Sequence, residues 1–427
     1  MIEKNRKYRI WTLVDYNMLP VHGTLNRHYY LGRALTESGD DVTVFAGSHP
    51  HNTNLQLIDG KEKYRIFQKK PFPWVLIKTL NYEGSKKKRI ISMLMYYKNA
   101  KAAVRHFEKP DVIIGSSAHP FCAVLANKLA RKYGAKSIVE IRDLWPESIV
   151  AMGIAKKTNP IIRILYFFER KIYERADAVI FTFEGGYDYI RMKGWDNSIP
   201  QSKVFYINNG IDINDFDKKI EENKLVDDDL NSGKFLVTYT GAIKLANGLD
   251  KLVDCAKLLM EKNDILFLIY GDGDFRPELE ARCKQENITN VRFKGKVDKK
   301  YIPYILSKSS LNLLNYNTAA ATAGLYRFGS SQNKLFDYLA SGKPVISNTK
   351  INYDVIEKYH CGVSKNLWTA EEYVTELLRI YEMPEEDYVC LCQNAREAAY
   401  DFDFSRHAAV LEEICKRITQ RSRHEEN

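Results

Sequence analysis

The sequence lacks the features that would mark a membrane-spanning, secreted or metal-binding protein. None of its apolar runs approaches the roughly 20 residues that a membrane-spanning helix needs. The charged start, MIEKNRKYRI, is unlike a secretory signal peptide. The seven cysteines are scattered, and nothing near the one close pair, Cys390 and Cys392, completes a set of metal ligands. We therefore expect reduced thiols and a cytoplasmic protein.

Acidic residues are in deficit. The chain has 64 Lys and Arg against 54 Asp and Glu, which gives a formal net charge of +10. Such a charge suits nucleic acid, an anionic membrane surface or phosphate-bearing substrates, but no nucleic-acid-binding motif accompanies it. The densest basic run, Lys86 to Arg89, adjoins the largely apolar residues 90–95. This stretch is either a solvated helix face or a patch that contacts the inner face of the membrane.

Short apolar segments alternate with amphipathic ones along the chain. Strand-like runs such as RIWTLV and DVIIGS stand between helix-like runs such as NRHYYLGRALTES, and the alternation restarts near Lys203. This order indicates parallel sheets covered by helices on both faces. We predict two doubly wound α/β domains, residues 1–202 and 203–403, with ligands in a cleft between the carboxyl edges of their strands. The charged residues 217–234 are typical of a surface loop.

The run FGSSQNKLFDYLASGKPVIS, residues 328–347, joins a small-residue loop to a helix pattern and the start of a strand. Ser331 or Asn333 can cap the helix, which the glycine of SGKP then ends. Small residues before a helix N-terminus let backbone N–H groups approach an anion, which the helix dipole also favours. Lys334 adds positive charge there, and Asp337, one turn later, suits sugar hydroxyls. The run indicates either a nucleoside diphosphate site or an ordinary capped helix.

This run resembles the signature of the retaining glycosyltransferases of family 4, whose GT-B fold has two Rossmann-like domains facing across a cleft. In that family the acid at the position of Asp337 binds the ribose of the donor. Other segments resemble motifs of the family in the expected order. They are IRDLWPES (141–148), which is typical of enzymes that assemble O-antigen, capsule or exopolysaccharide, INNGID (207–212), YTGAIKLANGLDKLVDCAKLL (239–259), LIYGDGDFRPELE (268–280), VRFKGKV (291–297) and DFSRHAAVLEEICKRI (403–418). The last implies a C-terminal helix, residues 404–427, that crosses back to the first domain.

Three positions depart from the pattern of the family. Gly329 stands where the family has a first acid, and Ala242 and Asn247 stand where many members have an arginine and a lysine that hold the diphosphate. We expect Lys244 and Lys334 to supply this charge instead, because a diphosphate in a cleft needs cationic or N–H partners. A plain surface lysine is the alternative for Lys244.

Several residues of the first domain are candidates for the acceptor side. His119 follows a strand in IIGSSAHPF, at an edge where ligand-binding residues collect. The resemblance implies that His119 contacts the transferring sugar, and a structural histidine is the alternative. Arg142, Asp143 and Glu147 lie at the next strand end, where they would bind the acceptor or pair with one another. Arg27 faces either the cleft or the solvent.

The resemblance implies a full set of site residues. His119, Asp143 and Lys334 are the catalytic candidates, and Arg27, Arg142 and Glu147 are the acceptor-binding ones. The acids at 272, 274 and 227–229 invite a metal, but we expect no metal and no cofactor, because this fold usually holds the diphosphate with cationic side chains and helix N-termini. The donor-binding candidates are Gly23 (alternatively a plain turn), Gly241, Lys244, Gly271, Lys296, Val297, Gly329, Ser330, Ser331, Lys334, Leu335 and Asp337.

The expected activity is that of a retaining hexosyl- or N-acetylhexosaminyl-transferase. It would move a sugar from a nucleotide sugar, UDP-linked by expectation, to a glycan or a polyprenyl-diphosphate-linked acceptor in cell-surface polysaccharide synthesis. Peripheral contact of the basic first domain with the membrane would accompany it. The alternatives are a UDP-sugar epimerase of the same fold and a non-catalytic member of a polysaccharide assembly complex.

Overall fold

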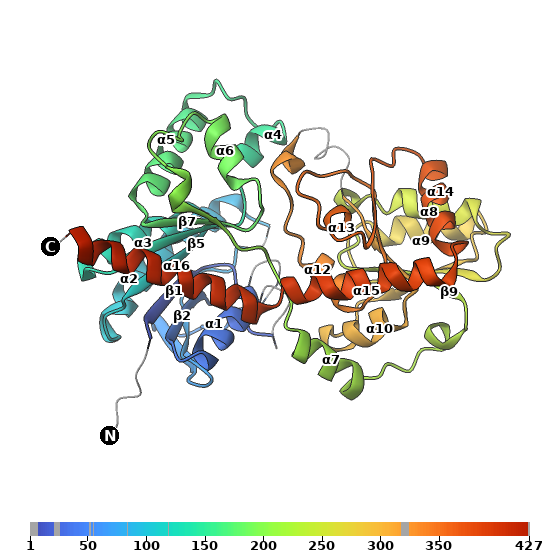
Figure 1. Ribbon diagram of the computed structural model, residues 1–427, viewed down its shortest axis with the longest axis horizontal. Coiled ribbons are helices and arrows are strands. Elements are labelled where there is room, and N and C mark those ends of the chain that lie inside the picture. The colour runs from blue at the N-terminus through green and yellow to red at the C-terminus, as the bar shows by residue number, and fades with distance from the viewer. Residues whose placement is uncertain are drawn as a thin grey trace. The chain divides into compact units, whose positions relative to one another are not determined.

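Two domains make up the chain in the computed structural model. The structure describes residues 7–20, 26–50, 53, 55–82, 84–117, 119–316 and 324–425. The first domain comprises Met1–Asn208 with Phe404–Asn427, and the second comprises Asn209–Asp403 (Figure 1). Within the described residues, no helix is both long enough and apolar enough to span a bilayer.

An eight-stranded sheet forms the centre of the first domain. Its strand order is β3-β4-β2-β1-β5-β6-β7-β8, and every neighbouring pair is parallel except β3 with β4. Near-continuous apolar runs form these strands because helices cover both faces of the sheet. The strands are β1 (Arg9–Val14), β2 (Asp41–Gly47), β3 (Tyr64–Gln68), β4 (Trp74–Ile77), β5 (Val112–Ser117), β6 (Lys136–Ile141), β7 (Ala178–Phe181) and β8 (Val204–Tyr206).

Helices on the two faces of this sheet enclose separate apolar cores. Alternate residues of β1 show the division: Ile10 and Val14 pack towards α1 and α16, whereas Trp11 and Leu13 pack towards α2 and α3. The helices are α1 (Arg27–Glu37), α2 (Lys86–Ala103), α3 (Pro120–Tyr133), α4 (Glu147–Ala151), α5 (Pro160–Arg175), α6 (Gly186–Met192) and α16 (Phe404–Glu425). Helix α16 packs along α1, which confirms the predicted return of the C-terminal helix to the first domain.

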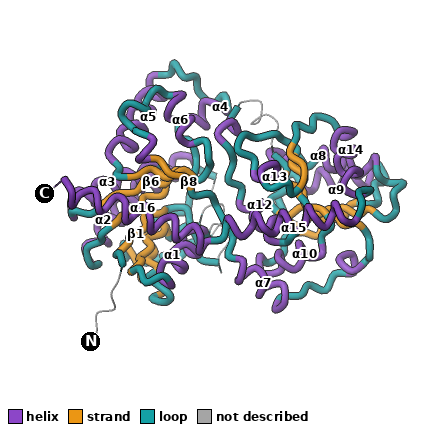
Figure 2. The backbone as a smooth tube through the Cα atoms, in the orientation of Figure 1, coloured by secondary structure: helices purple, strands orange, loops and turns teal. Residues whose placement is uncertain are grey.

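A six-stranded, all-parallel sheet forms the centre of the second domain. Its order is β11-β10-β9-β12-β13-β14. The strands are β9 (Phe235–Thr240), β10 (Ile265–Tyr270), β11 (Val291–Gly295), β12 (Leu311–Leu314), β13 (Val345–Ser347) and β14 (Gly362–Ser364). The helices, drawn in purple in Figure 2, are α7 (Ile213–Glu222), α8 (Asp250–Leu258), α9 (Arg276–Gln285), α10 (Ile302–Lys308), α12 (Asn333–Ala340), α13 (Val355–Lys358), α14 (Ala370–Tyr381) and α15 (Glu385–Asp401).

Two local predictions were wrong. The strand after Lys203, placed by its sequence at the start of the second sheet, is β8, which pairs with β7 at the edge of the first sheet. The charged residues 217–234 are not all loop, since α7 runs to Glu222. Helix α7 forms there because Asp212 caps its N-terminus, accepting from the Asp215 N–H at 2.9 Å, and Phe216 packs into the core.

Candidate functional site

The N-terminus of α12 follows the small-residue loop of the second domain, as predicted. Its capping differs from the prediction: Gln332 is the N-cap and gives no side-chain hydrogen bond. The Ser331 Oγ instead accepts a hydrogen bond from the backbone N–H of Asn209 at 3.2 Å. Among the described residues, the backbone N–H groups of Ser330, Asn333 and Lys334 have no acceptor. These donors, at the positive end of a helix dipole, are suited to an anion.

Lys334 lies beside these amides without a carboxylate partner. Its Nζ donates to the Tyr239 hydroxyl at 3.1 Å and lies 4.4 Å from the centre of the Tyr239 ring. Among the described residues it forms no ion pair, and burial lowers the pKa of its ammonium. A partly buried cation without an acid is costly in the free protein, so an anionic ligand would relieve that cost.

Asp337 lies one turn beyond Lys334 on α12. Its carboxylate makes no hydrogen bond to the described residues, and burial raises its pKa, against the positive charges of Lys299 and Lys219. The side chain is partly exposed. An acceptor-only group with open lone pairs is suited to hydroxyl donors such as those of a ribose.

Two glycine loops meet next to Tyr239. A Cβ atom at Gly271 would lie 1.8 Å from the Gly241 carbonyl oxygen, and one at Gly241 would lie 3.1 Å from Lys334 Nζ. Both glycines have positive φ, at 151° and 145°. Glycine is therefore needed at 241 and 271 for the close approach of the two loops, a packing reason that stands beside the predicted donor contact.

The other predicted donor residues differ in their exposure. Lys244 is exposed, and its side chain makes no hydrogen bond or ion pair with the described residues. Lys296 is also exposed, directly after β11, while Val297 packs against the core beneath that strand. Gly329 has a φ of 96°, a conformation that glycine adopts without strain. Gly23, predicted to approach the donor, lies outside the described residues.

Leu335 corrects the predicted donor set. Its side chain is 3% exposed within the core below α12, and its backbone N–H already donates to the Gln332 carbonyl at 3.2 Å. The helix turns this position inwards, one residue after Lys334, because successive residues point about 100° apart. Leu335 therefore holds α12 on the sheet and offers a ligand neither a side chain nor a free amide.

At the carboxyl edge of the first sheet, His119 pairs with an acid that sequence reasoning missed. His119 Nε2 lies 2.9 Å from Asp15 Oδ2, and its Nδ1 accepts from the Phe121 N–H at 3.3 Å as the N-cap of α3. The proton is therefore assigned to Nε2. Both side chains are 3% exposed. The pair joins the loops after β1 and β5, so both ring nitrogens of His119 are engaged within the domain.

Arg27, predicted to face the cleft or the solvent, is buried instead. Its Nε donates to Glu140 at 2.9 Å, and its Nη atoms donate to the carbonyl oxygens of Ile207 and Asn208. His28 and Ser116 share the same carboxylate. Because these partners occupy its guanidinium, Arg27 ties the end of the first domain to β6, and we withdraw it from the acceptor-binding set.

Glu147 is likewise occupied. Its buried carboxylate accepts from the Tyr166 hydroxyl and from Lys193, with Lys157 3.7 Å away. It therefore fixes α4 to α5 and α6, and we withdraw it as well. Arg142 is partly buried and donates to the Tyr16 carbonyl at 3.3 Å, so the predicted structural pairings of Arg142 give way to a backbone contact. Asp143 is exposed and makes no hydrogen bond with the described residues.

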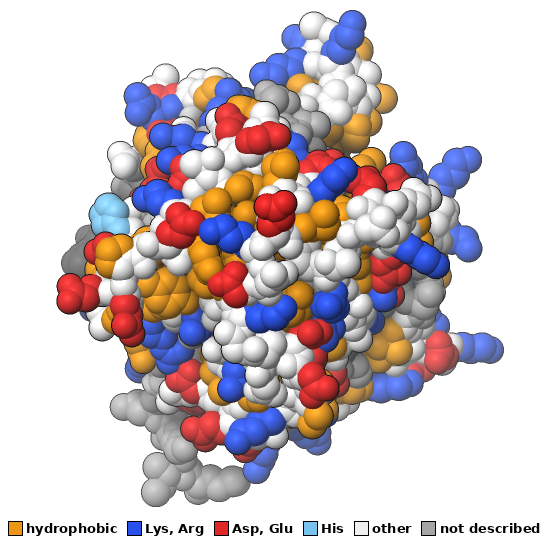
Figure 3. All heavy atoms as spheres, turned by 90° about the vertical axis from the view of Figure 1, so that its right-hand side faces the viewer, with side chains coloured by type: hydrophobic (Ala, Val, Ile, Leu, Met, Phe, Trp, Pro, Cys, Tyr) orange, Lys and Arg blue, Asp and Glu red, His pale blue; other side chains and the backbone are white. Residues whose placement is uncertain are grey.

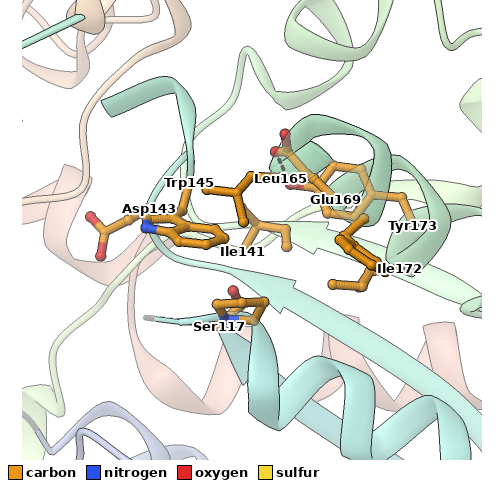
Figure 4. A pocket seen from close by; sticks show the side chains of 10 residues that line it. Ser117, Ile141, Asp143, Trp145, Leu165, Glu169, Ile172 and Tyr173 are labelled. Carbon is orange, nitrogen blue, oxygen red and sulfur yellow. Dashed lines mark hydrogen bonds between the residues drawn. The ribbon is translucent and has the colours of Figure 1, made fainter. Parts of the chain in front are cut away.

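A small, largely apolar pocket opens beside Asp143 at the ends of β5 and β6 (Figure 4). The Asp143 carboxylate points away from its apolar lining. At the other end, Glu169 is buried and accepts hydrogen bonds from the hydroxyls of Tyr173 at 2.8 Å and Tyr189 at 2.9 Å. Burial raises the pKa of Glu169 to about 8. The lining comprises Ser117, Pro120, Ile141, Asp143, Trp145, Leu165, Phe168, Glu169, Ile172 and Tyr173.

The acids that could suggest a metal site, for which we expected no metal, have other partners or none among the described residues. Lys294 lies between Asp227 and Asp229, with its Nζ 2.6 Å from an oxygen of each. Asp272 lies 3.9 Å from Arg276. Within the described residues, no group of three or more His, Cys, Asp and Glu is arranged to hold a metal ion.

Comparison with known proteins identifies the family. The profile of "Glycosyltransferase Family 4" matches residues 22–215, and that of "Glycosyl transferases group 1" matches residues 234–383. The first profile spans strands β2 to β8 of the first sheet, and the second spans all six strands of the second sheet. The chain belongs to glycosyltransferase family 4.

Two curated relatives extend this assignment. The chain is 26% identical over 242 residues to an Escherichia coli K12 protein named for a glycosyl transferase of colanic acid biosynthesis, WcaI. It is 21% identical over 240 residues to a Pseudomonas aeruginosa protein named as the glycosyltransferase WbjE. The matches cover 55% and 56% of this chain and 56% and 57% of the two relatives, so the chain spans about half the length of the relatives it matches.

Solved structures of other proteins share the GT-B fold over nearly the whole length of this chain. Sucrose-phosphate synthase from Thermosynechococcus elongatus superposes with a TM-score of 0.70 at 16% identity, covering 96% of this chain and 99% of that one. Anabaena Alr3699/HepE in complex with UDP gives a TM-score of 0.65 at 13% identity, covering 95% and 98%. These likenesses confirm the predicted fold class.

Proposed function

We propose that the protein is a retaining glycosyltransferase that moves a hexosyl or N-acetylhexosaminyl residue from a UDP-sugar to a lipid-linked acceptor in cell-surface polysaccharide synthesis. The observation that carries this proposal is the N-terminus of α12, where open amides, a cation without an acid and a carboxylate without a donor lie within two turns. Support comes from HepE, whose structure holds UDP, and from WcaI, whose name refers to colanic acid biosynthesis.

The second domain would hold the donor. In this proposal the diphosphate accepts hydrogen bonds from the backbone N–H groups of Ser330, Asn333 and Lys334 and from the Lys334 ammonium group. The ribose hydroxyls donate to Asp337. The exposed Lys244 adds charge from the loop after β9, and the backbone near Lys296 faces the base. Since these groups neutralise the diphosphate, the leaving UDP needs no divalent ion, and its developing charge is stabilised where it forms.

The first domain would hold the acceptor at the carboxyl edge of its sheet. His119 and Asp15 act there as positioning residues, because their pairing fixes the loops after β1 and β5. Asp143, exposed and without a hydrogen bond to the described residues, is the carboxylate that remains to accept a hydrogen bond from an acceptor hydroxyl during binding. Anomeric configuration is retained by attack from the side of the departing phosphate, which takes the proton.

The test has two arms. Isothermal titration with UDP, GDP and ADP should give the tightest binding for UDP, and binding should be lost in Lys334→Ala/Lys244→Ala. Mass spectrometry should then detect sugar on a polyprenyl-diphosphate-linked acceptor only when donor and acceptor are both present. An epimer formed from the donor alone would assign the site to an epimerase, and an absence of UDP binding would overturn the proposal.

A further inference from the structure

An exposed apolar surface lies on the first domain, whereas the described donor candidates belong to the second. It consists of Met152, Ile154, Ile161, Ile164, Phe167 and Phe168, each between 54% and 71% exposed; we name it the α5 face. Single exposed apolar residues are ordinary on protein surfaces. Six of them within 17 residues of sequence, four of them on one helix, are not.

Helix geometry gathers the four residues of α5 into one stripe. Ile161, Ile164 and Phe168 follow the i, i+3, i+7 spacing of a single face, and Phe167 adjoins them. The opposite side of α5 packs into the domain, where Ile162 and Tyr173 are buried. The helix therefore has one apolar side in its own core and a second apolar side whose four residues are each more than half exposed.

Packing fixes the orientation of this stripe. Glu169, on the buried side, accepts a hydrogen bond from the Tyr189 hydroxyl of α6, and the Tyr166 hydroxyl donates to Glu147 of α4. Trp195 packs edge-on against both Tyr173 and Tyr189, with ring centres 6.2 and 6.0 Å away. These bonds hold α5 against rotation about its axis, so the stripe cannot be turned inwards without breaking them.

Basic residues outnumber acidic ones around the α5 face. Residues 152–171 contain five basic residues, Lys156, Lys157, Arg163, Arg170 and Lys171. Glu169 is the one acid of this segment, and its carboxyl group is buried and has its pKa raised by that burial to about 8. Glu174 pairs with Arg170 and Lys171, and Glu147 lies 3.7 Å from Lys157. Lys156 and Arg163 are exposed and form no ion pair with the described residues, so the segment presents apolar groups with these cations beside them. By contrast, basic and acidic side chains are interspersed on the face of the second domain that Figure 3 shows.

A neighbouring helix carries a smaller surface of the same kind. Helix α3 packs against both α2 and α5, so the three lie in one layer. On α2, Ile90, Ile91 and Leu94 are 57%, 51% and 49% exposed behind the basic run Lys86–Arg89. This is the stretch for which the sequence left open a membrane patch or a solvated helix face.

We propose that the α5 face inserts into the headgroup region of an anionic bilayer, with α2 as a weaker secondary contact. An apolar stripe flanked by lysine and arginine is complementary to acyl chains beneath anionic headgroups. A protein partner would need acidic groups placed to match the basic residues of the α5 face. An anionic bilayer needs only an apolar surface with basic side chains beside it, and the α5 face offers both. Only the reason for membrane contact, which is access to a lipid-linked acceptor, rests on the proposed function.

The position of the α5 face suits that purpose. Phe168 belongs both to this face and to the lining of the pocket at the ends of β5 and β6, where Trp145 and Asp143 also lie. A bilayer that contacts the α5 face would thus lie next to the edge of the sheet assigned to the acceptor. A lipid-linked sugar could reach Asp143 while its lipid remains in the membrane.

Vesicle co-sedimentation of the full chain tests the proposal. Binding to vesicles of phosphatidylglycerol and phosphatidylethanolamine should exceed binding to pure phosphatidylcholine at least tenfold, and it should weaken with salt. Ile161→Ser/Ile164→Ser/Phe167→Ser should lower the binding at least tenfold. All three side chains are more than half exposed, so the variant should keep its thermal midpoint and its UDP-induced shift, which separates this test from that of the donor site.

Two matched variants sharpen the outcome. Val226→Ser/Leu258→Ser/Val389→Ser removes exposed apolar residues of the second domain and should leave vesicle binding unchanged. Ile90→Ser/Ile91→Ser/Leu94→Ser should lower it less than the α5 variant does. A wild-type protein that does not bind anionic vesicles would overturn the proposal. So would full loss of binding in the α2 variant alone, or an oligomer in light scattering that only the α5 variant dissociates, since the α5 face would then join copies of the chain.

Discussion

Replacing Lys334 by methionine should change stability and nucleotide affinity in opposite directions. The side chain keeps its length and apolar stem but loses an ammonium whose pKa burial already lowers and which has no acid partner among the described residues. Removing an unpaired, partly buried charge should raise the free energy of unfolding of the second domain by roughly 1 kcal/mol. Losing one charge-assisted bond to the diphosphate should weaken UDP binding by about 1.5–3 kcal/mol, or roughly 10- to 150-fold.

Lys294 offers a matched control in the same domain. Its Nζ lies 2.6 Å from both Asp227 and Asp229, so Lys294→Met removes the cation that these two carboxylates share and should lower stability while leaving UDP affinity unchanged. Thermal unfolding and isothermal titration of the two variants supply both quantities. If Lys334→Met were destabilised as Lys294→Met is, or bound UDP like the wild type, Lys334 would be a structural residue and the reasoning would be refuted.

Three further predictions concern single side chains. Burial raises the pKa of Glu169 from its ordinary 4.5 to about 8, so this carboxyl group loses its proton at a lower pH in the unfolded chain than in the folded one. The free energy of unfolding of the first domain should therefore fall as pH rises between these values, by up to about 1.4 kcal/mol per pH unit. Glu169→Gln should abolish this slope in urea titrations followed by tryptophan fluorescence; a slope that persists would contradict the assignment. Asp337→Asn should weaken the binding of UDP at least tenfold more than the binding of inorganic pyrophosphate in competition titrations, because only UDP has a ribose. Equal losses of affinity for the two ligands would show that Asp337 does not bind the ribose. Arg27→Ala should cost roughly 3–5 kcal/mol of first-domain stability by leaving Glu140 buried without its cation, and it should leave UDP affinity unchanged; a loss of affinity with intact stability would return Arg27 to the site.

The sequence pattern predicted the architecture because buried parallel strands are long apolar runs that few other structures share. It failed at β8, since three half-buried residues at a sheet edge carry no such signal. The site at α12 was predictable because its loop, cation and acid lie within ten residues of one another. Only the turn of the helix decided that Leu335 points into the core.

Long-range pairs were beyond the reach of sequence reasoning. The partners of Arg27 and His119, Glu140 and Asp15, are more than 100 residues away along the chain, so their burial becomes visible only in the fold. Tyr239 looked like an ordinary strand residue, yet its hydroxyl connects Lys334 to the glycine loop after β9. The stripe on α5 matches a core helix in sequence, and only packing shows which of its two apolar sides faces out.

The central claim is that the open amides at the start of α12 hold the diphosphate of the donor. Hydrogen–deuterium exchange with and without UDP measures these amides directly. We predict that peptides covering residues 329–336 gain protection on binding and that this gain is lost in Lys334→Met at the same UDP concentration. Saturating UDP that leaves these peptides unchanged, while it protects amides elsewhere, would contradict the account.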